Sequence, residues 1–272
     1  MQKTEMRNEH SRGLDKMTTL EMISVMNQEN YNAVKAVEEA SNEIAAAIHV
    51  IAERMKAGGR LIYIGAGTSG RLGVIDAAEC PPTFGVSKER VTGIIAGGHS
   101  TMVNASEGAE DVEEAGVRDV QQVDICSKDA LVGISAAGNA KYVAGALKAA
   151  KEVGAAAIGL TCNRECLLAE IADILIVTDT GAEVITGSTR LKAGTAHKLV
   201  LNMLSTFAMV KLGMVYDNYM INVKPVNIKL RQRCIRIIHQ ITGVDMETAE
   251  LALDEAGGDI RTAIEKIERK EQ

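Results

Sequence analysis

Aromatic residues are scarce in this chain of 272 residues, which has no tryptophan and only two phenylalanines. Because 46% of the residues are hydrophobic, the core must be aliphatic, built from Ala, Val, Ile, Leu and 12 Met. Such a composition is typical of helices packed on a parallel sheet, whose strands are continuous aliphatic runs because both faces are buried. The length allows one large domain, or a medium-sized domain with an appendage.

Basic residues are outnumbered by acidic ones, and the formal net charge is -6. A protein that binds nucleic acid needs a basic stripe, and no basic run with interleaved aromatics occurs. No apolar run approaches the roughly 18–20 residues of a membrane span, and residues 1–17 lack the apolar core of a signal peptide. The sequence therefore predicts a cytoplasmic protein with no nucleic-acid and no membrane partner.

Cysteine is also sparse, with five residues scattered along the chain. Only Cys162 and Cys166 lie close together, and no histidine is near them in the sequence. This spacing disfavours a zinc site and favours reduced thiols.

Short aliphatic runs alternate with helical segments through the middle of the chain. We predict five strands, at residues 61–65, 91–96, 130–135, 155–160 and 174–178. This alternation predicts an α/β fold, a doubly wound parallel sheet with right-handed crossovers.

Helical periodicity flanks this core on both sides. Residues 18–57 are expected to be helical after a threonine cap, and a long amphipathic helix is expected at 190–213. Beyond residue 225 three short helices are expected, separated by Gly243 and Gly257-Gly258. The predicted parts are N-terminal helices packing on the core or a partner subunit (1–57), the core (58–215) and a helical appendage (225–272).

The first strand leads into a glycine-rich loop, residues 65–73. Glycine lets the backbone approach a ligand, and the amides at the following helix N-terminus attract an anion. We therefore predict that this loop holds a phosphorylated ligand, with binding residues Gly67, Thr68, Ser69 and Arg71. The glycine spacing also fits a dinucleotide site, but the second strand ends at His99 without the carboxylate that would bind the ribose. A glycine turn without any ligand is the third interpretation.

Two further loops are expected at the same edge, because the carboxyl ends of parallel strands lie together, where open α/β sheets bind ligands. Both are rich in hydroxyl and small residues, which suit a polyhydroxy phosphate but also serve as helix caps. The predicted binding residues in them are Ser135, Asn139, Glu183, Ser188, Thr189 and Lys192.

Four motifs together carry a family resemblance. They are Gly65-Ala66-Gly67-Thr68-Ser69-Gly70-Arg71-Leu72-Gly73, Asp76-Ala77-Ala78-Glu79-Cys80-Pro81-Pro82-Thr83, Glu107-Gly108-Ala109-Glu110-Asp111 and Gly187-Ser188-Thr189-Arg190-Leu191-Lys192-Ala193-Gly194-Thr195-Ala196. In order and spacing the chain, from about Thr19 to its C-terminal helices, resembles the N-acetylmuramic acid 6-phosphate etherases. That family has a sugar isomerase (SIS) domain, related to glucokinase regulatory protein, and a terminal bundle similar to ubiquitin-associated domains.

The resemblance implies a cytoplasmic carbon–oxygen lyase of peptidoglycan recycling. Such an enzyme splits the D-lactyl ether of N-acetylmuramic acid 6-phosphate, leaving N-acetylglucosamine 6-phosphate and D-lactate. The resemblance also implies a homodimer with sites near the subunit interface and no metal or nucleotide cofactor. The family's two catalytic carboxylates correspond to Glu79 and Glu110.

Elimination of lactate needs a base for the C2 proton, which the C1 aldehyde of the open-chain sugar acidifies, and an acid for the leaving oxygen. Glu79 is expected just before Pro81-Pro82 ends its helix, where the helix dipole disfavours a charged carboxylate and suits a proton donor. Glu110 is then the expected base. The two roles could be exchanged, and Glu107 or Glu114 could stand in place of Glu110.

The chain departs from the family in the second loop. The family usually has Ser-Gly-Arg-Thr-Pro where this chain has Ala137-Gly138-Asn139-Ala140-Lys141. Two hydroxyls and an arginine are missing, and each lost hydrogen bond to a charged group costs about 1.5–3 kcal/mol. Ser135 or Lys141 could compensate. This departure favours a rival hypothesis, a sugar-phosphate-sensing regulatory module, whereas the two glutamates favour the enzyme. A sugar-phosphate isomerase is a third option.

Overall fold

The structure is a computed structural model that describes residues 2–104 and 106–270. The described chain divides into two compact units. The first unit extends up to Ala78 and includes Glu89–Ala208; the second consists of Glu79–Lys88 and the chain from Met209 onward. The sequence did not suggest that Glu79–Lys88 belongs with the C-terminal helices.

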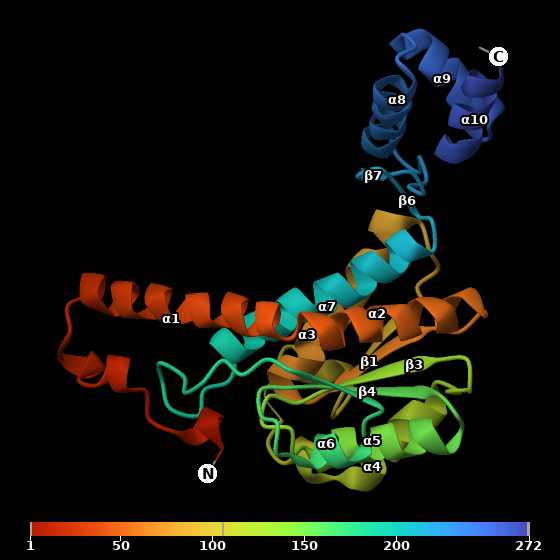
Figure 1. Ribbon diagram of the computed structural model, residues 1–272. Helices are drawn as coiled ribbons and strands as arrows, with labels where there is room; N and C mark the ends of the chain where they lie inside the picture. Colours follow the sequence, from red (N-terminus) through yellow and green to blue (C-terminus); the bar gives the residue numbers. More distant parts are fainter. Residues whose placement is uncertain (1, 105, 271–272) are drawn as a thin grey trace. The chain divides into compact units, whose positions relative to one another are not determined.

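The described residues of the first unit form a parallel sheet of five strands (Figure 1). The strands are β1 (Leu61–Gly65), β2 (Val91–Ile95), β3 (Ala130–Ile134), β4 (Ala156–Thr161) and β5 (Ile174–Val177). Their order is β2-β1-β3-β4-β5, so the direction of winding reverses between β1 and β3. Each predicted strand is present within one residue at either end, and the predicted doubly wound α/β fold is confirmed.

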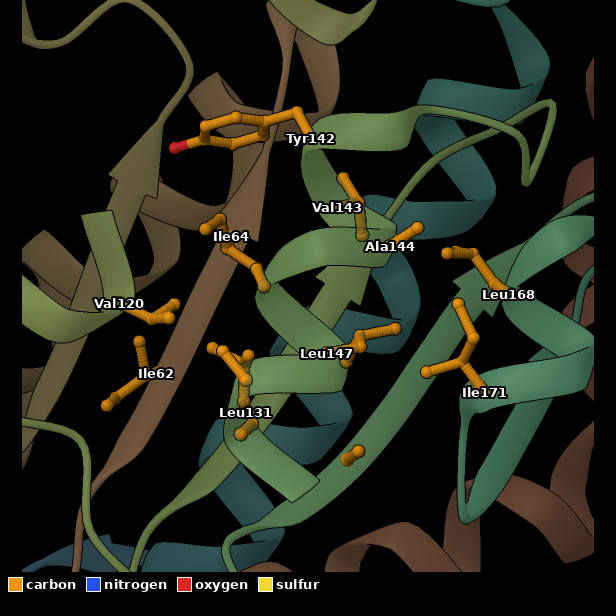
Figure 2. Close-up of a cluster of buried hydrophobic side chains, with 14 of the residues drawn as sticks. Ile62, Ile64, Val120, Leu131, Tyr142, Val143, Ala144, Leu147, Leu168 and Ile171 are labelled. Atoms are coloured by element: carbon orange, nitrogen blue, oxygen red, sulfur yellow. The ribbon is translucent and has the colours of Figure 1, made fainter. Parts of the chain in front are cut away.

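One face of the sheet is covered by α4 (Glu113–Gln122), α5 (Lys141–Glu152) and α6 (Leu167–Ile171). Figure 2 shows Ile62 and Leu131 of the sheet packed with Leu147 of α5 in an aliphatic cluster. Burial of each such side chain contributes about 1.5–3 kcal/mol. The aliphatic core expected from the scarcity of aromatic residues is therefore present.

The opposite face carries α2 (Ser41–Lys56), α3 (Gly67–Phe84) and α7 (Lys192–Lys211). Because side chains alternate along a strand, Tyr63 of β1 points away from its neighbours Ile62 and Ile64. Its hydroxyl lies 2.9 Å from the carboxylate of Asp76 in α3 and 3.3 Å from the carbonyl of Leu201 in α7. This contact joins β1, α3 and α7.

The N-terminal region contains short 3-10 helices at Lys3–Glu5, Glu9–Ser11 and Leu14–Lys16, followed by α1 (Thr19–Glu39). Thr18 and Glu21 form a capping box, so the predicted threonine cap is confirmed. Ala40 interrupts the helical stretch, ending α1 and preceding the first residue of α2. Among the helices of the described residues, none has both the length and the apolar character to cross a membrane.

The expectation that Pro81-Pro82 ends α3 is wrong, because the helix continues to Phe84 with both prolines inside it. The fixed φ of proline fits a helix, and the cost lies in the missing N–H donors and the clash with the preceding turn. Here both prolines lie near the end of the helix. Glu79 therefore lies more than one turn before the helix end. At that distance the dipole effect has faded, so the dipole argument for a proton donor does not apply.

The second unit has a short antiparallel pair, β6 (Val215–Tyr216) and β7 (Tyr219–Met220), followed by α8 (Ile228–Thr242), α9 (Met246–Glu255) and α10 (Ile260–Lys270). The helices predicted beyond residue 225 are thus present. Gly243 ends α8 in the left-handed conformation (φ 77°), as expected of a glycine at a helix C-terminus. Cys234, Ile238 and Leu253 belong to the unit's own aliphatic core.

Candidate active site

A cavity of about 270 Å³ lies at the carboxyl ends of β1 and β3 in the first unit. This is the edge at which open α/β sheets bind ligands. Its walls come from three loops of the sheet, from the first two turns of α7 and from two separate glutamates. The lining residues are Glu5, Ala66, Gly67, Thr68, Ser69, Glu110, Ile134, Ser135, Ala136, Ala137, Ala140, Gly187, Thr189, Gly194 and His197.

The first glycine loop brings Gly67, Thr68 and Ser69 to the cavity, as the sequence predicted. A β-carbon on Gly70 would lie 2.5 Å from the carbonyl oxygen of Gly65, so glycine is required where the start of α3 returns close to the strand. The amides of Thr68 and Ser69 lie in the first turn of α3 and have no intrahelical acceptor. Together with the two hydroxyls, they form a site suited to an anion.

Arg71 forms hydrogen bonds with the protein backbone. Its guanidinium donates hydrogen bonds to the carbonyls of Thr101 (2.6 Å), Met102 (2.9 Å) and Asn104 (3.0 Å). These bonds fix the loop after β2. Arg71 is not among the residues that line the cavity, and its role in ligand binding stays a prediction.

The second loop places Ser135, Ala137 and Ala140 at the cavity. The Ser135 hydroxyl accepts a hydrogen bond from the amide of Gly138 (3.1 Å) and keeps its own proton for another partner. Asn139 is exposed, and its side-chain oxygen accepts from the amide of Leu167 (2.9 Å). Asn139 thus joins the second loop to α6.

The third loop contributes Gly187 and Thr189 to the lining. Ser188 between them is half-buried, and its amide donates to the carbonyl of Ile185 (2.9 Å). Its hydroxyl is not part of the cavity wall, so its binding role also stays a prediction.

Glu183 and Lys192 are buried beside the third loop. Glu183 accepts hydrogen bonds from the amides of Lys192 (3.3 Å) and Ala193 (2.9 Å) at the start of α7, and burial raises the pKa of its carboxyl. The Lys192 ammonium pairs with Glu29 of α1. Burial opposes a charged Glu29, but hydrogen bonds from Lys192, His10 and Asn8 lower its pKa to about 2. These groups connect α1, α7 and the N-terminal segment beside the cavity.

The two predicted catalytic carboxylates lie in different compact units. Glu110, in a short 3-10 helix (Ala109–Asp111), is exposed and lines the cavity. Glu107 and Glu114 are not among the residues that line it. Glu79 is an exposed residue of α3 in the second unit. Both assignments stay predictions.

The sequence reasoning missed two ionisable residues of the cavity, Glu5 and His197. His197 is 1% exposed, and burial lowers its pKa to about 4, so the imidazole is neutral at pH 7. Its Nε2 lies 3.5 Å from the sulfur of Cys162. His197 could have been found from the sequence, because it is a polar residue on the apolar face of the long predicted helix. No pattern in the sequence indicated that Glu5 lies at the cavity. In the described part of the chain, no cluster of three or more His, Cys, Asp or Glu side chains could hold a metal ion.

Proteins of known families match nearly the whole chain. The N-acetylmuramic acid 6-phosphate etherase 1 of Bacillus licheniformis is 50% identical over 98% of this chain and 88% of its own length. The etherases of Halalkalibacterium halodurans and Clostridium beijerinckii are each 51% identical over 96% of this chain, and over 88% and 86% of their own lengths. The chain belongs to the N-acetylmuramic acid 6-phosphate etherase family. The resemblance seen in the four motifs is confirmed.

Residues 43–151 also match the family described as glucokinase regulatory protein N-terminal SIS domain. The phosphoheptose isomerase of Neisseria gonorrhoeae is similar to this etherase-family chain with a TM-score of 0.53, at 19% identity over 70% of this chain and 98% of that one. The phosphoheptose isomerase of Francisella tularensis is similar with a TM-score of 0.52, at 19% identity over 71% of this chain and 100% of that one. At such identity the similarity shows the fold alone.

Proposed function

We infer that the chain cleaves the D-lactyl ether of N-acetylmuramic acid 6-phosphate by elimination and hydration. One water is consumed, and D-lactate and N-acetylglucosamine 6-phosphate are released. The main support is about 50% identity to curated etherases over 96–98% of this chain. The cavity supports the same activity, because it combines an anion site with the carboxylate of Glu110.

The phosphate is proposed to bind at the start of α3. Among the described lining residues none is a lysine or arginine, so the amides and hydroxyls of Thr68 and Ser69 would hold the anion. Ser135 and Thr189 offer further hydroxyls. The other residues predicted from the sequence would support these loops.

The chemistry is proposed to use Glu110 as the base at C2 and Glu79 as the acid that protonates the departing lactate oxygen. The C2 proton leaves as an enolate forms, and the electron pair then expels the oxygen on C3. Water adds to the resulting double bond. An alkoxide leaves poorly, so the acid is needed as much as the base.

Release of D-lactate from N-acetylmuramic acid 6-phosphate tests this function directly. The lyase predicts equal amounts of D-lactate and N-acetylglucosamine 6-phosphate. An isomerase would instead convert an aldose phosphate to a ketose phosphate without lactate, and a sensing module would bind the sugar phosphate without turnover. Either result would replace the lyase assignment.

Restoring hydroxyls in the second loop is expected to strengthen substrate binding. Ala137 and Ala140 both line the cavity, where the family usually has Ser and Thr. The double variant Ala137→Ser/Ala140→Thr should lower KM about ten-fold, because each hydrogen bond to a charged group contributes about 1.5–3 kcal/mol and part is lost to ordering the side chains. Steady-state lactate release measures this effect. An unchanged KM would mean that neither position touches the phosphate.

We propose that the protein is a homodimer that uses α1 in its interface. Leu20, Ile23, Tyr31 and Val34 are exposed by 77%, 52%, 74% and 57%. At 3.6 residues per turn these four share one face of the helix. A face of this kind on a surface helix is typical of an interaction site.

Charged residues on this face are expected to separate the subunits. Tyr31→Glu/Val34→Glu should convert a dimer into a monomer in analytical ultracentrifugation, because it would bury two carboxylates without partners. Lys35→Glu/Glu39→Lys is the matched control, because it reverses an exposed ion pair that lies beside this face on the same helix. A dimer that survives the first change would exclude α1 from the interface.

The proposed setting is the cytoplasm, in the recycling of cell-wall amino sugars. None of the five cysteines, all of which the structure describes, forms a disulfide, which is typical of a reducing compartment. The net charge of -6 also supports a small-molecule ligand over a nucleic acid.

A further inference from the structure

The N-terminal segment, residues 2–16, is attached to loops at the carboxyl edge of the sheet. Gln2 donates from its side chain to the carbonyl of Ala137 after β3 (2.9 Å), and Lys3 pairs with Asp179 after β5. Figure 1 shows this segment beside the chain that follows β5. The segment therefore forms part of the wall around the cavity.

Two buried polar side chains fix the position of this segment. Thr4 is 1% exposed, and its hydroxyl oxygen accepts a hydrogen bond from Asn163 (3.4 Å) in the loop after β4. Asn8 is 8% exposed and donates to Glu29 (2.7 Å) and to the carbonyl of Ala182 (2.9 Å). Glu5 lies between these two anchors, so its backbone is held from both sides.

The carboxylate of Glu5 lines the cavity beside Gly187. A β-carbon on Gly187 would lie 3.1 Å from Oε2 of Glu5, so the missing side chain of Gly187 leaves room for the carboxylate. No hydrogen bond or ion pair to another described residue occupies it. It is thus an acceptor at the cavity wall that is available to a ligand.

We propose that Glu5 binds free hydroxyl groups of the sugar chain and thereby selects the polyhydroxyl part of the ligand. A carboxylate only accepts hydrogen bonds, and its two oxygens can accept from two neighbouring hydroxyls. The same negative charge repels phosphate, so it favours the ligand orientation in which the phosphate lies at Thr68 and Ser69. This inference rests on the proposed function, because it takes the ligand to be a phosphorylated amino sugar.

Isothermal titration calorimetry on the full chain tests the proposal by measuring the affinity for two probes, N-acetylglucosamine 6-phosphate and inorganic phosphate. Glu5→Ala should weaken the affinity for the sugar phosphate at least ten-fold. The affinity for inorganic phosphate should stay unchanged or rise slightly. Glu5→Gln, which keeps one acceptor oxygen, should lie between the wild type and Glu5→Ala. Glu9→Ala is the matched control, because the Glu9 carboxylate is on the same segment but pairs with Arg12 and does not line the cavity.

Equal sugar-phosphate affinity in Glu5→Ala and Glu9→Ala would overturn the proposal. So would an equal loss of affinity for both probes in Glu5→Ala, since that would indicate a general disturbance of the cavity. The lactate assay on the wild type is independent of this comparison. A wild type that binds the sugar phosphate but releases no lactate would contradict the lyase function and leave the Glu5 test valid.

Discussion

Glu110→Gln is expected to abolish both lactate release and exchange of the C2 hydrogen with solvent deuterium. Glutamine is close to glutamate in shape but cannot take a proton at neutral pH, so the first step of the reaction would be lost. Removal of a general base costs about a hundred- to ten-thousand-fold in rate. The substrate should still bind, because the anion site at Thr68 and Ser69 is unchanged. Proton NMR of the sugar in deuterium oxide measures the exchange.

The control for this variant lies in the same acidic stretch. Glu107→Gln changes an exposed carboxylate that does not line the cavity and should leave both reactions unchanged. If Glu107→Gln lost activity and Glu110→Gln retained it, the base would have to be reassigned to Glu107. Retention of activity in both would direct the search to Glu114.

Glu79→Gln is expected to abolish lactate release while the exchange of the C2 hydrogen continues. The base would still form the enolate, which takes up deuterium on return, but without an acid the lactate oxygen could not leave. The loss should again be about a hundred-fold or more. The same NMR experiment separates the two glutamates, because only one variant should keep the exchange.

The fold should persist in Glu79→Gln because the side chain is exposed. Unchanged circular dichroism and thermal midpoint are the controls. Full lactate release in this variant would remove Glu79 from the mechanism. Exchange lost in Glu79→Gln but kept in Glu110→Gln would mean that the two roles are exchanged.

Much of the sheet and part of the cavity followed from local sequence. Aliphatic runs such as Leu61–Gly65 predict buried strands, and parallel strands place their following loops at one edge. For this reason Thr68 and Ser135, which are far apart in the sequence, could be assigned to one site in advance. The structure places both at the cavity.

Which side chains of those loops face the cavity could not be predicted in this way. Hydroxyl and charged residues in a loop suit a ligand as well as a helix cap, and composition does not distinguish the two. Glu183 caps α7 and Lys192 pairs with Glu29, which is 163 positions away in the sequence. Only the packing of α1 beside α7 shows that these groups have partners within the protein, and their predicted roles in ligand binding stay predictions.

The aliphatic parallel sheet, the glycine-rich start of α3 as a predicted anion site, and the family of the chain all followed from the sequence alone, because these depend on neighbouring residues and on motifs in order. The tertiary structure decided that α3 continues through Pro81-Pro82, that His197 is buried and neutral, and that Glu5 reaches the cavity. Each of these depends on contacts between remote segments. Such contacts arise from burial and packing in space, which no local pattern records.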